Sequence, residues 1–421
     1  MPLPISDEQT LEGLLENLPQ NYQQTARETK AFLRARKVKN PVELMLLVLM
    51  YSGVDESLRE VAGNFTLLNE KITDTGVQKR LNSCGPWLKM ILEEMWFTGV
   101  NKLPGKLRFI VVDGSSLSVQ AADGTSYRLH IAIDLVSLSI VHIEVTDKHI
   151  GESLAHYPFI EGDIVLVDRG YNQPQEIINI TEKGILIVVR LNPYSMKLIY
   201  PDSKKKIHMY EELKKADADE FCIPVWSANQ KGDYVEAWVH ACRLPIEKRA
   251  EARRQCRKRS KTGNPKKETL MYCEWQMVLT TVPPEVLDTK TISTLYALRW
   301  QIEIFIKRLK SLLDIDKLRC PEDSPLNEVW LYGKLLFATL LMKKVDKTFS
   351  VEGIEPKKVR ESTPWRFWKV IRNNIKSIII GAFLWKKENI LAAKKVMEER
   401  PRKRQLQSLP DQIEELLLAF G

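Results

Sequence analysis

The amino-acid sequence predicts an α/β fold in which a mixed sheet is flanked by helices and interrupted by a β-rich insertion. Three observations support this class. Two apolar runs of β-forming residues, 107–113 and 163–168, each end in an aspartate. The pattern around them alternates between the two-residue period of strands and the longer period of helices. Residues 289–315 contain neither Gly nor Pro and carry an amphipathic helical pattern.

Composition indicates a globular protein that favours a polyanionic partner. The chain has 421 residues, enough for two or three domains, and 44% of them are hydrophobic. Its formal net charge of +9 favours a polyanion such as nucleic acid. The six cysteines form no CxxC pair, which argues against a zinc site or a disulfide framework. The sequence has no signal-peptide pattern and no apolar run long enough to span a bilayer, so we expect a cytoplasmic protein with no membrane partner.

Residues 1–100 are expected to be helical. An apolar helix is expected over residues 41–53, a capping box begins a second helix at Ser57, and a third helix begins at Asp74. Two short helices separated by a turn fit either a helix-turn-helix that reads DNA or a plain helical bundle. The pattern leaves both alternatives open.

Two aspartates stand at the ends of apolar strands in residues 101–195. Residues 107–113 predict a buried strand that delivers Asp113 at its end, and residues 163–168 predict a second strand that ends in Asp168. Active-site residues of α/β sheets gather at the carboxyl ends of strands. Each aspartate also has a local alternative, because Asp113 could form a turn and Asp168 could cap the helix that follows.

The remaining pattern of this part completes the sheet. Further strands are expected at residues 127–135, 139–146 and 184–190. A helix is expected from Pro174 onward. Asp134 and Asp163 are competing acids, but Asp134 lies in a predicted hairpin and Asp163 at the start of its strand. We therefore favour Asp113 and Asp168 as the functional acids.

Residues 196–284 predict the β-rich insertion. Its β-forming runs are residues 221–226, 234–242 and 271–281. Between residues 243 and 267, eleven Lys or Arg stand against two Glu. Such a charge run is either a solvated strip or an arm that contacts phosphates, and the sequence alone does not decide between them.

Residues 285–345 complete the core, and their first helix carries four polar residues along the border of its apolar stripe. At roughly 100° per residue these four fall within an arc of roughly 60°. They are Tyr296, Arg299, Glu303 and Lys310. An Arg299–Glu303 pair one turn apart is common in plain amphipathic helices. A carboxylate flanked by cations also looks like half of a metal and phosphate site.

The C-terminal region, residues 346–421, is expected to be helical and basic. It contains Trp365, Phe367, Trp368 and Trp385 and ends in an amphipathic helix. Such a region could cover the core, dimerise or contact DNA, and the sequence does not choose among these roles.

Asp113, Asp168 and Glu303 together form an acidic set suited to two divalent cations. Hard oxygen ligands favour Mg²⁺ or Mn²⁺. A pair of ions can activate a water on one side of a phosphodiester and stabilise the leaving oxygen on the other. None of the six histidines has metal-ligand spacing, so we do not expect an all-histidine metal site.

The chain resembles the DDE transposases of bacterial cut-and-paste insertion sequences, in the hairpin-forming group marked by a Tyr-x2-Arg-x3-Glu-x6-Lys signature. The residues that reproduce this spacing are Tyr296, Arg299, Glu303 and Lys310. Asp113 at a strand end and the Asp-Arg-Gly-Tyr motif at residues 168–171 also match the group. The resemblance covers about residues 105 to 345.

The resemblance implies a ribonuclease-H-like catalytic core. Its metal-binding triad would be Asp113, Asp168 and Glu303, with two Mg²⁺ or Mn²⁺ ions in each active site. The residues implied to contact DNA are Tyr296, Arg299, Lys310, Trp275 and Arg190. Trp275 would stack on a flipped base when the transposon end is closed as a hairpin. Its place in the predicted strand 271–281 also fits a plain core residue, and both alternatives stay open.

The same resemblance implies partners and a location. The partners would be the terminal inverted repeats of the transposon and the target DNA, bound by a homodimer at the bacterial nucleoid. The activity would combine phosphodiester hydrolysis with strand transfer. Two alternatives remain: a metal-dependent nuclease with the same core, and a non-catalytic DNA-binding protein derived from a transposase.

Overall fold

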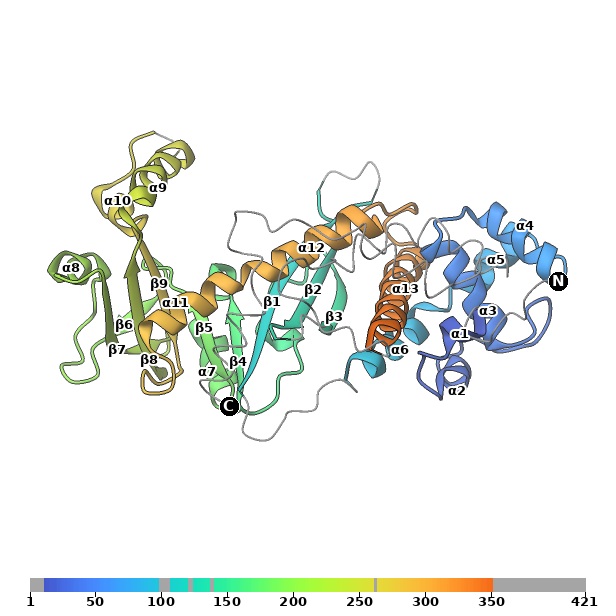
Figure 1. The fold of residues 1–421 in the computed structure, drawn as a ribbon, viewed down its shortest axis with the longest axis horizontal. Helices are drawn as coiled ribbons and strands as arrows, with labels where there is room; N and C mark the ends of the chain where they lie inside the picture. Colours follow the sequence, from blue (N-terminus) through green and yellow to red (C-terminus); the bar gives the residue numbers. More distant parts are fainter. Residues whose placement is uncertain (1–10, 98–106, 120–123, 137–139, 261–262, 351–421) are drawn as a thin grey trace.

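A computed structural model describes residues 11–97, 107–119, 124–136, 140–260 and 263–350 of the chain. The N-terminal helices lie at one end of an elongated molecule, and the strands of the insertion lie at the other (Figure 1). The aromatic residues and the amphipathic helix expected after residue 350 lie outside the described residues. The expected division into five regions therefore stays a prediction.

A mixed sheet of nine strands forms the centre of the described part, in the order β3-β2-β1-β4-β5-β9-β8-β7-β6. β1 pairs parallel with β4 and β4 parallel with β5, whereas all other neighbours are antiparallel. The strands are β1 (Arg108–Leu117), β2 (Tyr127–Asp134), β3 (Ile140–Asp147), β4 (Asp163–Val167), β5 (Leu186–Arg190), β6 (Lys197–Ile199), β7 (Glu220–Ala228), β8 (Tyr234–Arg243) and β9 (Trp275–Thr280).

Helices cover this sheet and form the N-terminal region. Those before the sheet are α1 (Leu11–Leu15), α2 (Tyr22–Glu28), α3 (Pro41–Val48), the π-helical turn η2 (Leu49–Gly53), α4 (Leu58–Leu68), α5 (Asp74–Leu81) and α6 (Gly85–Phe97). Those within and after it are η3 (Leu154–His156), η4 (Arg169–Tyr171), α7 (Pro174–Thr181), α8 (Met209–Lys215), α9 (Ile246–Arg259), α10 (Lys267–Tyr272), α11 (Thr289–Leu298), α12 (Trp300–Leu313) and α13 (Pro325–Ser350).

The three N-terminal helices that the sequence predicts individually begin where expected. α3 runs on through η2 to Gly53, Ser57 and Glu60 form the expected capping box, and α5 begins at Asp74. η2 and α6 pack against α13, so this region and the sheet share one hydrophobic core. Whether any of these helices reads DNA stays open.

The prediction that the first strand ends at Asp113 is wrong. β1 continues to Leu117, and Gly114 pairs with His130 of β2 in the antiparallel ladder. The parallel pairing of β1 with β4, however, stops at Val111 and Leu166. Asp113 therefore lies just beyond the parallel part of the sheet, although its own strand goes on.

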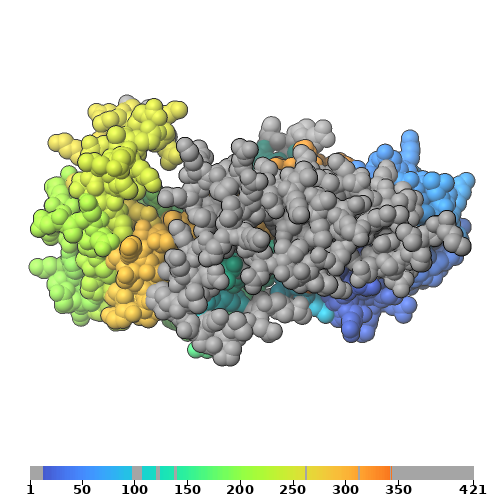
Figure 2. Space-filling model, viewed as in Figure 1, coloured from blue at the N-terminus to red at the C-terminus, as the bar shows by residue number. Residues whose placement is uncertain are grey.

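The insertion contains the three expected strands together with β6, and it also contains helices that the sequence did not predict. The basic run contains α9, which has no buried residue, and residues 267–272 form α10, so the predicted strand 271–281 begins only at Trp275. β9 pairs with β5, which means that the strands of the insertion extend the core sheet. α9 and α10 stand out from the sheet at the end opposite the N-terminal helices (Figure 1, Figure 2).

The helix expected over residues 289–315 is broken at Arg299 into α11 and α12. Tight hydrogen bonds between residues three apart, from the Arg299 amide to the Tyr296 carbonyl and from the Ile302 amide to the Arg299 carbonyl, replace the α-helical pattern there. α12 crosses β1, and the expected apolar stripe is buried wherever its side chains are described (Figure 1). The stripe comprises Leu295, Leu298, Ile302, Phe305, Ile306, Leu309 and Leu313. The side chain of Leu312, also expected in it, lies outside the described part of the chain.

Candidate active site

Arg299 links two acids that come from distant parts of the sequence. Its Nη2 lies 2.6 Å from Oε1 of Glu303, and its Nη1 lies 3.9 Å from Oδ2 of Asp113. The guanidinium also lies 5.7 Å from the ring centroid of Tyr296. Arg299 is only 9% exposed, so these contacts are screened little by solvent. The break between α11 and α12 thus carries a buried cation that joins α12 to β1.

Asp168 approaches the same place from the neighbouring strand. It follows β4 directly, and its Oδ1 accepts a hydrogen bond of 2.5 Å from the Gly170 amide, which caps η4. Burial raises the pKa of Asp113 to about 6, Arg299 opposes the rise, and the charge of Asp168 adds to it. Two carboxylates are therefore close enough to repel each other at the point where β1 and β4 stop pairing.

Cations surround these acids. Arg190 ends β5 and is exposed, and burial followed by the charge of Arg190 lowers the pKa of Arg169. Burial raises the pKa of Tyr296, whereas Arg299 and Arg190 lower it. Lys310 of α12 donates a hydrogen bond of 3.0 Å to the Ser116 carbonyl of β1. Arg299 and Lys310 therefore both contact β1, the strand that carries Asp113.

Trp275 differs from the other DNA-contact candidates because its indole is only 5% exposed. The ring packs edge-on against Phe221 at 5.7 Å and lies 5.6 Å from the Arg243 guanidinium. No contact between Trp275 and the three acids is found among the described residues. As the structure stands, the indole is part of the core formed by β7, β8 and β9.

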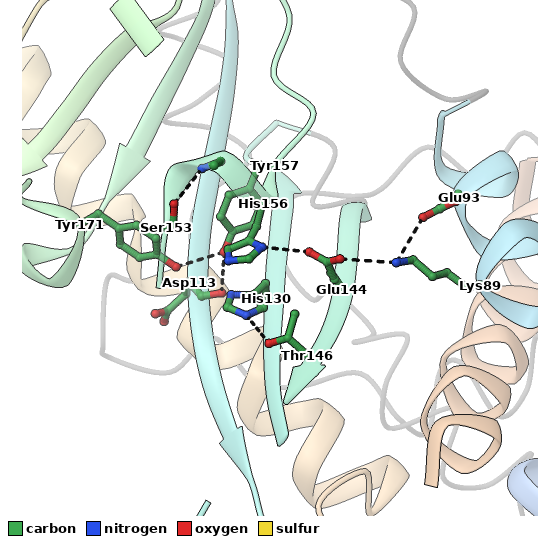
Figure 3. Close-up of polar contacts among 11 residues, drawn as sticks. Lys89, Glu93, Asp113, His130, Glu144, Thr146, Ser153, His156, Tyr157 and Tyr171 are labelled. Carbon is green, nitrogen blue, oxygen red and sulfur yellow. Dashed lines mark hydrogen bonds and ion pairs between the residues drawn. The ribbon is translucent and has the colours of Figure 1, made fainter. Parts of the chain in front are cut away.

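Two tyrosine hydroxyls form a hydrogen-bonded network that ends at the backbone carbonyl of Asp113. The Tyr157 hydroxyl donates to the Asp113 carbonyl at 3.4 Å and lies 3.0 Å from the Tyr171 hydroxyl (Figure 3). Tyr171 is the last residue of the Asp-Arg-Gly-Tyr motif and is fully buried. The motif that carries Asp168 is therefore tied through Tyr157 to the strand that carries Asp113.

Glu152 is an acid of this region that the sequence analysis missed. An ideal Cβ on Gly114 would lie 2.9 Å from its Oε1, and one on Gly170 would lie 2.6 Å from its Oε2. Burial and the charge of Asp168 raise the pKa of Glu152. The sequence contains one signal for this contact: Gly114 follows Asp113, and Gly170 lies two residues after Asp168. The signal can be interpreted only when the structure shows that Glu152 lies beside both glycines.

The chemistry of the donors fits a divalent cation. The carboxylates present hard oxygen ligands, and bringing like charges together costs free energy that a cation would offset. Within the described ranges, no group of three or more Asp, Glu, His or Cys is already spaced to hold an ion. Glu303 is instead turned to Arg299, so binding an ion would require this pair to open.

Known proteins resemble this chain over most of its length. Residues 104–340, more than half of the chain, match the family described as transposase DDE domain. Transposase InsL of insertion element IS186A from Escherichia coli (strain K12), named as putative, is 27% identical over 334 residues, covering 77% of this chain and 90% of its own. The transposase of IS421 from Escherichia coli is 27% identical over 335 residues, with the same coverage. The transposase of IS231E from Bacillus thuringiensis subsp. finitimus is 24% identical over 287 residues, 63% of this chain and 58% of its own.

No helix in the part of the chain that the structure describes is long and apolar enough to cross a membrane. The mixed sheet with its flanking helices is compatible with the matched family, and the matched segment contains Asp113, Asp168 and Glu303. The chain therefore belongs to the DDE transposase family.

Proposed function

We propose that the protein is a DNA transposase with a ribonuclease-H-like core, in which Asp113, Asp168 and Glu303 hold two Mg²⁺ or Mn²⁺ ions. The observation that carries this proposal is the position of Arg299 between Glu303 and Asp113, with Asp168 adding its charge to that of Asp113. In this proposal β1, the segment that follows β4, and α12 each supply one acid to a common site. Two ions bound there would activate a water and stabilise the leaving oxygen of a phosphodiester.

The cations around the acids would hold the DNA backbone. Arg299 is a planar donor suited to phosphate oxygens, and turning it toward DNA would free Glu303 to bind an ion. Lys310 and Arg190 would contact phosphates beside the cleaved end, and Tyr296 would support Arg299. Trp275 would reach a flipped base only by leaving its present packing, so this role requires local rearrangement on DNA binding.

The proposed reaction is cut-and-paste transposition. Water attacks the phosphorus at the transposon end, and the bond to the 3′ oxygen breaks to leave a 3′-hydroxyl. That hydroxyl attacks the opposite strand, which closes a hairpin and releases the flanking DNA. A second water reopens the hairpin, and the 3′-hydroxyl then attacks a phosphodiester of the target. The partners would be the terminal inverted repeats and target DNA, bound by a homodimer at the nucleoid.

A metal-dependent nuclease with the same core is the second candidate. The burial of Trp275 favours it, because the structure offers no exposed indole at that position for a flipped base. A non-catalytic DNA-binding protein is less favoured, since all three acids and the signature cations are present. Formation of a hairpin product would distinguish the transposase from the nuclease.

Cleavage of a duplex that carries the inverted repeat flanking the gene tests the proposal. Asp113→Asn, Asp168→Asn and Glu303→Gln should each abolish Mg²⁺-dependent cleavage and leave DNA binding nearly unchanged, because the metals serve chemistry and the basic surface serves affinity. Asp134→Asn, at the end of β2, is the matched control and should cut normally. Cleavage by Glu303→Gln at the normal rate would overturn the assignment of α12 to the site.

A further inference from the structure

The loop between β3 and η3 is fixed over the candidate active site. The Ser153 hydroxyl accepts a hydrogen bond from the Ala155 amide, and the Leu154 amide donates to Glu176 of α7 at 2.9 Å. Two residues further, Tyr157 is hydrogen-bonded to the Asp113 carbonyl (Figure 3). Glu152, directly before these anchors, therefore has a defined position relative to β1 and α7.

The carboxylate of Glu152 lies beside Gly114 of β1 and Gly170 of η4, each close to one of the aspartates. One of its oxygens occupies the space beside Gly114 and the other the space beside Gly170, at 2.9 and 2.6 Å from where a Cβ would be. Real Cβ contacts essentially never approach within 3 Å, so any larger residue at either position would displace the carboxylate. Gly114 follows Asp113 directly, and Gly170 donates its amide to Asp168.

The backbone does not explain these two glycines. Gly162 and Gly184, with φ of 80° and 74°, adopt the left-handed conformation that favours glycine, whereas Gly114 and Gly170 do not. What glycine provides at 114 and 170 is room for Glu152. Gly114 and Gly170 thus both leave space, close to Asp113 and Asp168, for the carboxylate of Glu152.

This arrangement is costly unless a cation is bound. Glu152 has no hydrogen bond or ion pair with any residue in the described ranges, and Arg128 is the cation that acts on it. Three half-buried carboxylates that face one another repel. A divalent ion bound by all three carboxylates would offset this repulsion.

We propose that Glu152 is a fourth acidic residue of the active site and binds a divalent cation together with Asp113 and Asp168. This inference rests on the proposed function, because it places Glu152 in the same metal site. In the conformation described, Glu303 is paired with Arg299. The carboxylates of Glu152, Asp113 and Asp168 are not at ligand distances in this conformation, so they would draw together around the first ion before DNA draws Arg299 away and releases Glu303.

Binding of Mn²⁺ alone to the full-length, DNA-free protein tests this proposal, with the free ion measured by electron paramagnetic resonance. Glu152→Gln keeps the shape of the side chain and removes its charge, so Mn²⁺ affinity should fall roughly tenfold or more. Asp168→Asn should also weaken binding, and Asp134→Asn should stay within twofold of the wild type. Melting curves of the metal-free variants would show that each is folded.

Two results would overturn the inference in different ways. If Glu152→Gln binds Mn²⁺ within twofold of the wild type while Asp168→Asn does not, Glu152 is not a ligand and the proposed metal site survives. If both variants bind normally, the metal site itself is wrong, and the inference falls with it.

A second set of variants tests the placement of the carboxylate. Gly170→Ala should weaken Mn²⁺ binding severalfold because its Cβ displaces Glu152, yet should add less than twofold in a Glu152→Ala background. Gly151→Ala is the control, since its Cβ would meet nothing within 4 Å. Equal effects of Gly170→Ala in both backgrounds would show that Glu152 does not occupy the space beside Gly170.

Discussion

The Arg299 guanidinium and the Glu303 carboxylate form an ion pair of 2.6 Å across the start of α12. The same guanidinium lies 3.9 Å from Asp113. Glu303 is thus already neutralised by a cation of its own chain, which a divalent ion would have to replace. Arg299 pairs with the acids in this conformation, and in the proposed site it would compete with a metal ion for Glu303.

Replacing Arg299 with Gln should therefore have two opposite effects. The metal-free protein should lose about 2 kcal/mol of unfolding free energy, because partly buried Glu303 loses a charged hydrogen-bond partner and Asp113 loses a nearby cation. Affinity for Mn²⁺ should rise, because the competing cation is gone. Denaturant unfolding and Mn²⁺ titration would measure both effects, with Lys307→Gln, exposed on α12, as the control. Unchanged stability would contradict the role given to the ion pair.

The second prediction concerns the pH dependence of stability and His130, a buried residue of β2 that pairs with Gly114 of β1. Its Nε2 lies 2.9 Å from the Thr146 hydroxyl, and its ring stacks on His156 at 4.3 Å (Figure 3). Burial, helped by the charge of His156, lowers the pKa of His130 from 6.5 to about 4, although Glu144 opposes the shift. Between these two pH values the unfolded chain binds a proton at this position and the folded chain does not.

Unfolding free energy should consequently fall as pH drops from 6.5 to 4, and the part due to His130 should be on the order of 3 kcal/mol. The raised pKa of Asp113 acts in the opposite direction, so the comparison must be between variants. His130→Asn should show a flatter acid limb than the wild type, whereas His208→Asn, at an exposed position, should not. Parallel pH profiles of unfolding for wild type and His130→Asn would rule this mechanism out.

The third prediction separates the two roles of Trp275. Because the indole is buried against Phe221, Trp275→Ala should cost about 3–5 kcal/mol of unfolding free energy and depress every activity together. Trp275→Leu keeps an apolar side chain but no aromatic face. If Trp275 stacks on a flipped base, the Leu variant should nick DNA normally and form much less hairpin. Normal amounts of both products on gels would show that Trp275 serves packing alone.

The fourth prediction concerns the cations of α9, which are not equivalent. Arg253 is paired with Glu274, and Arg254 with Glu251 at 2.7 Å. The last turn of α9 also carries Arg257, Lys258 and Arg259, which are exposed and form no ion pair within the described ranges. These three are the candidates for phosphate contacts.

Changing all three to Gln should reduce the slope of log K against log salt by somewhat under one unit for each phosphate that the variant no longer binds. Arg254→Gln, which removes a cation that is already paired, should change the slope little. DNA binding measured over a range of salt concentrations would provide the comparison. An unchanged slope in the triple variant would mean that α9 is only a solvated surface.

Local patterns predicted much of the fold. Alternation of apolar residues located the strands of the core sheet, and capping chemistry located the starts of α4 and α5. The spacing of Arg299 and Glu303 indicated an ion pair one turn apart, and the structure contains it. These features depend on neighbours within a few residues, which is why the sequence alone reveals them.

Features that depend on distant contacts were missed. β1 continues past Asp113 because Gly114 and the two serines after it pair with β2. Gly and Ser have weak strand propensity, so the sequence does not predict this continuation. α9 forms although its residues bury nothing. The approach of Glu152 to Gly114 of β1 and Gly170 of η4 joins three segments that are not neighbours in the sequence. No local pattern encodes such an approach.

The most direct test of the central claim is the anomalous scattering of Mn²⁺ in crystals of the full-length protein. We predict a peak bonded to carboxylate oxygens of both Asp113 and Asp168 at roughly 2 Å. With DNA bound, a second peak should appear beside Glu303, about 4 Å from the first. Protein that cleaves DNA at the same Mn²⁺ concentration but shows no peak between Asp113 and Asp168 would contradict the account.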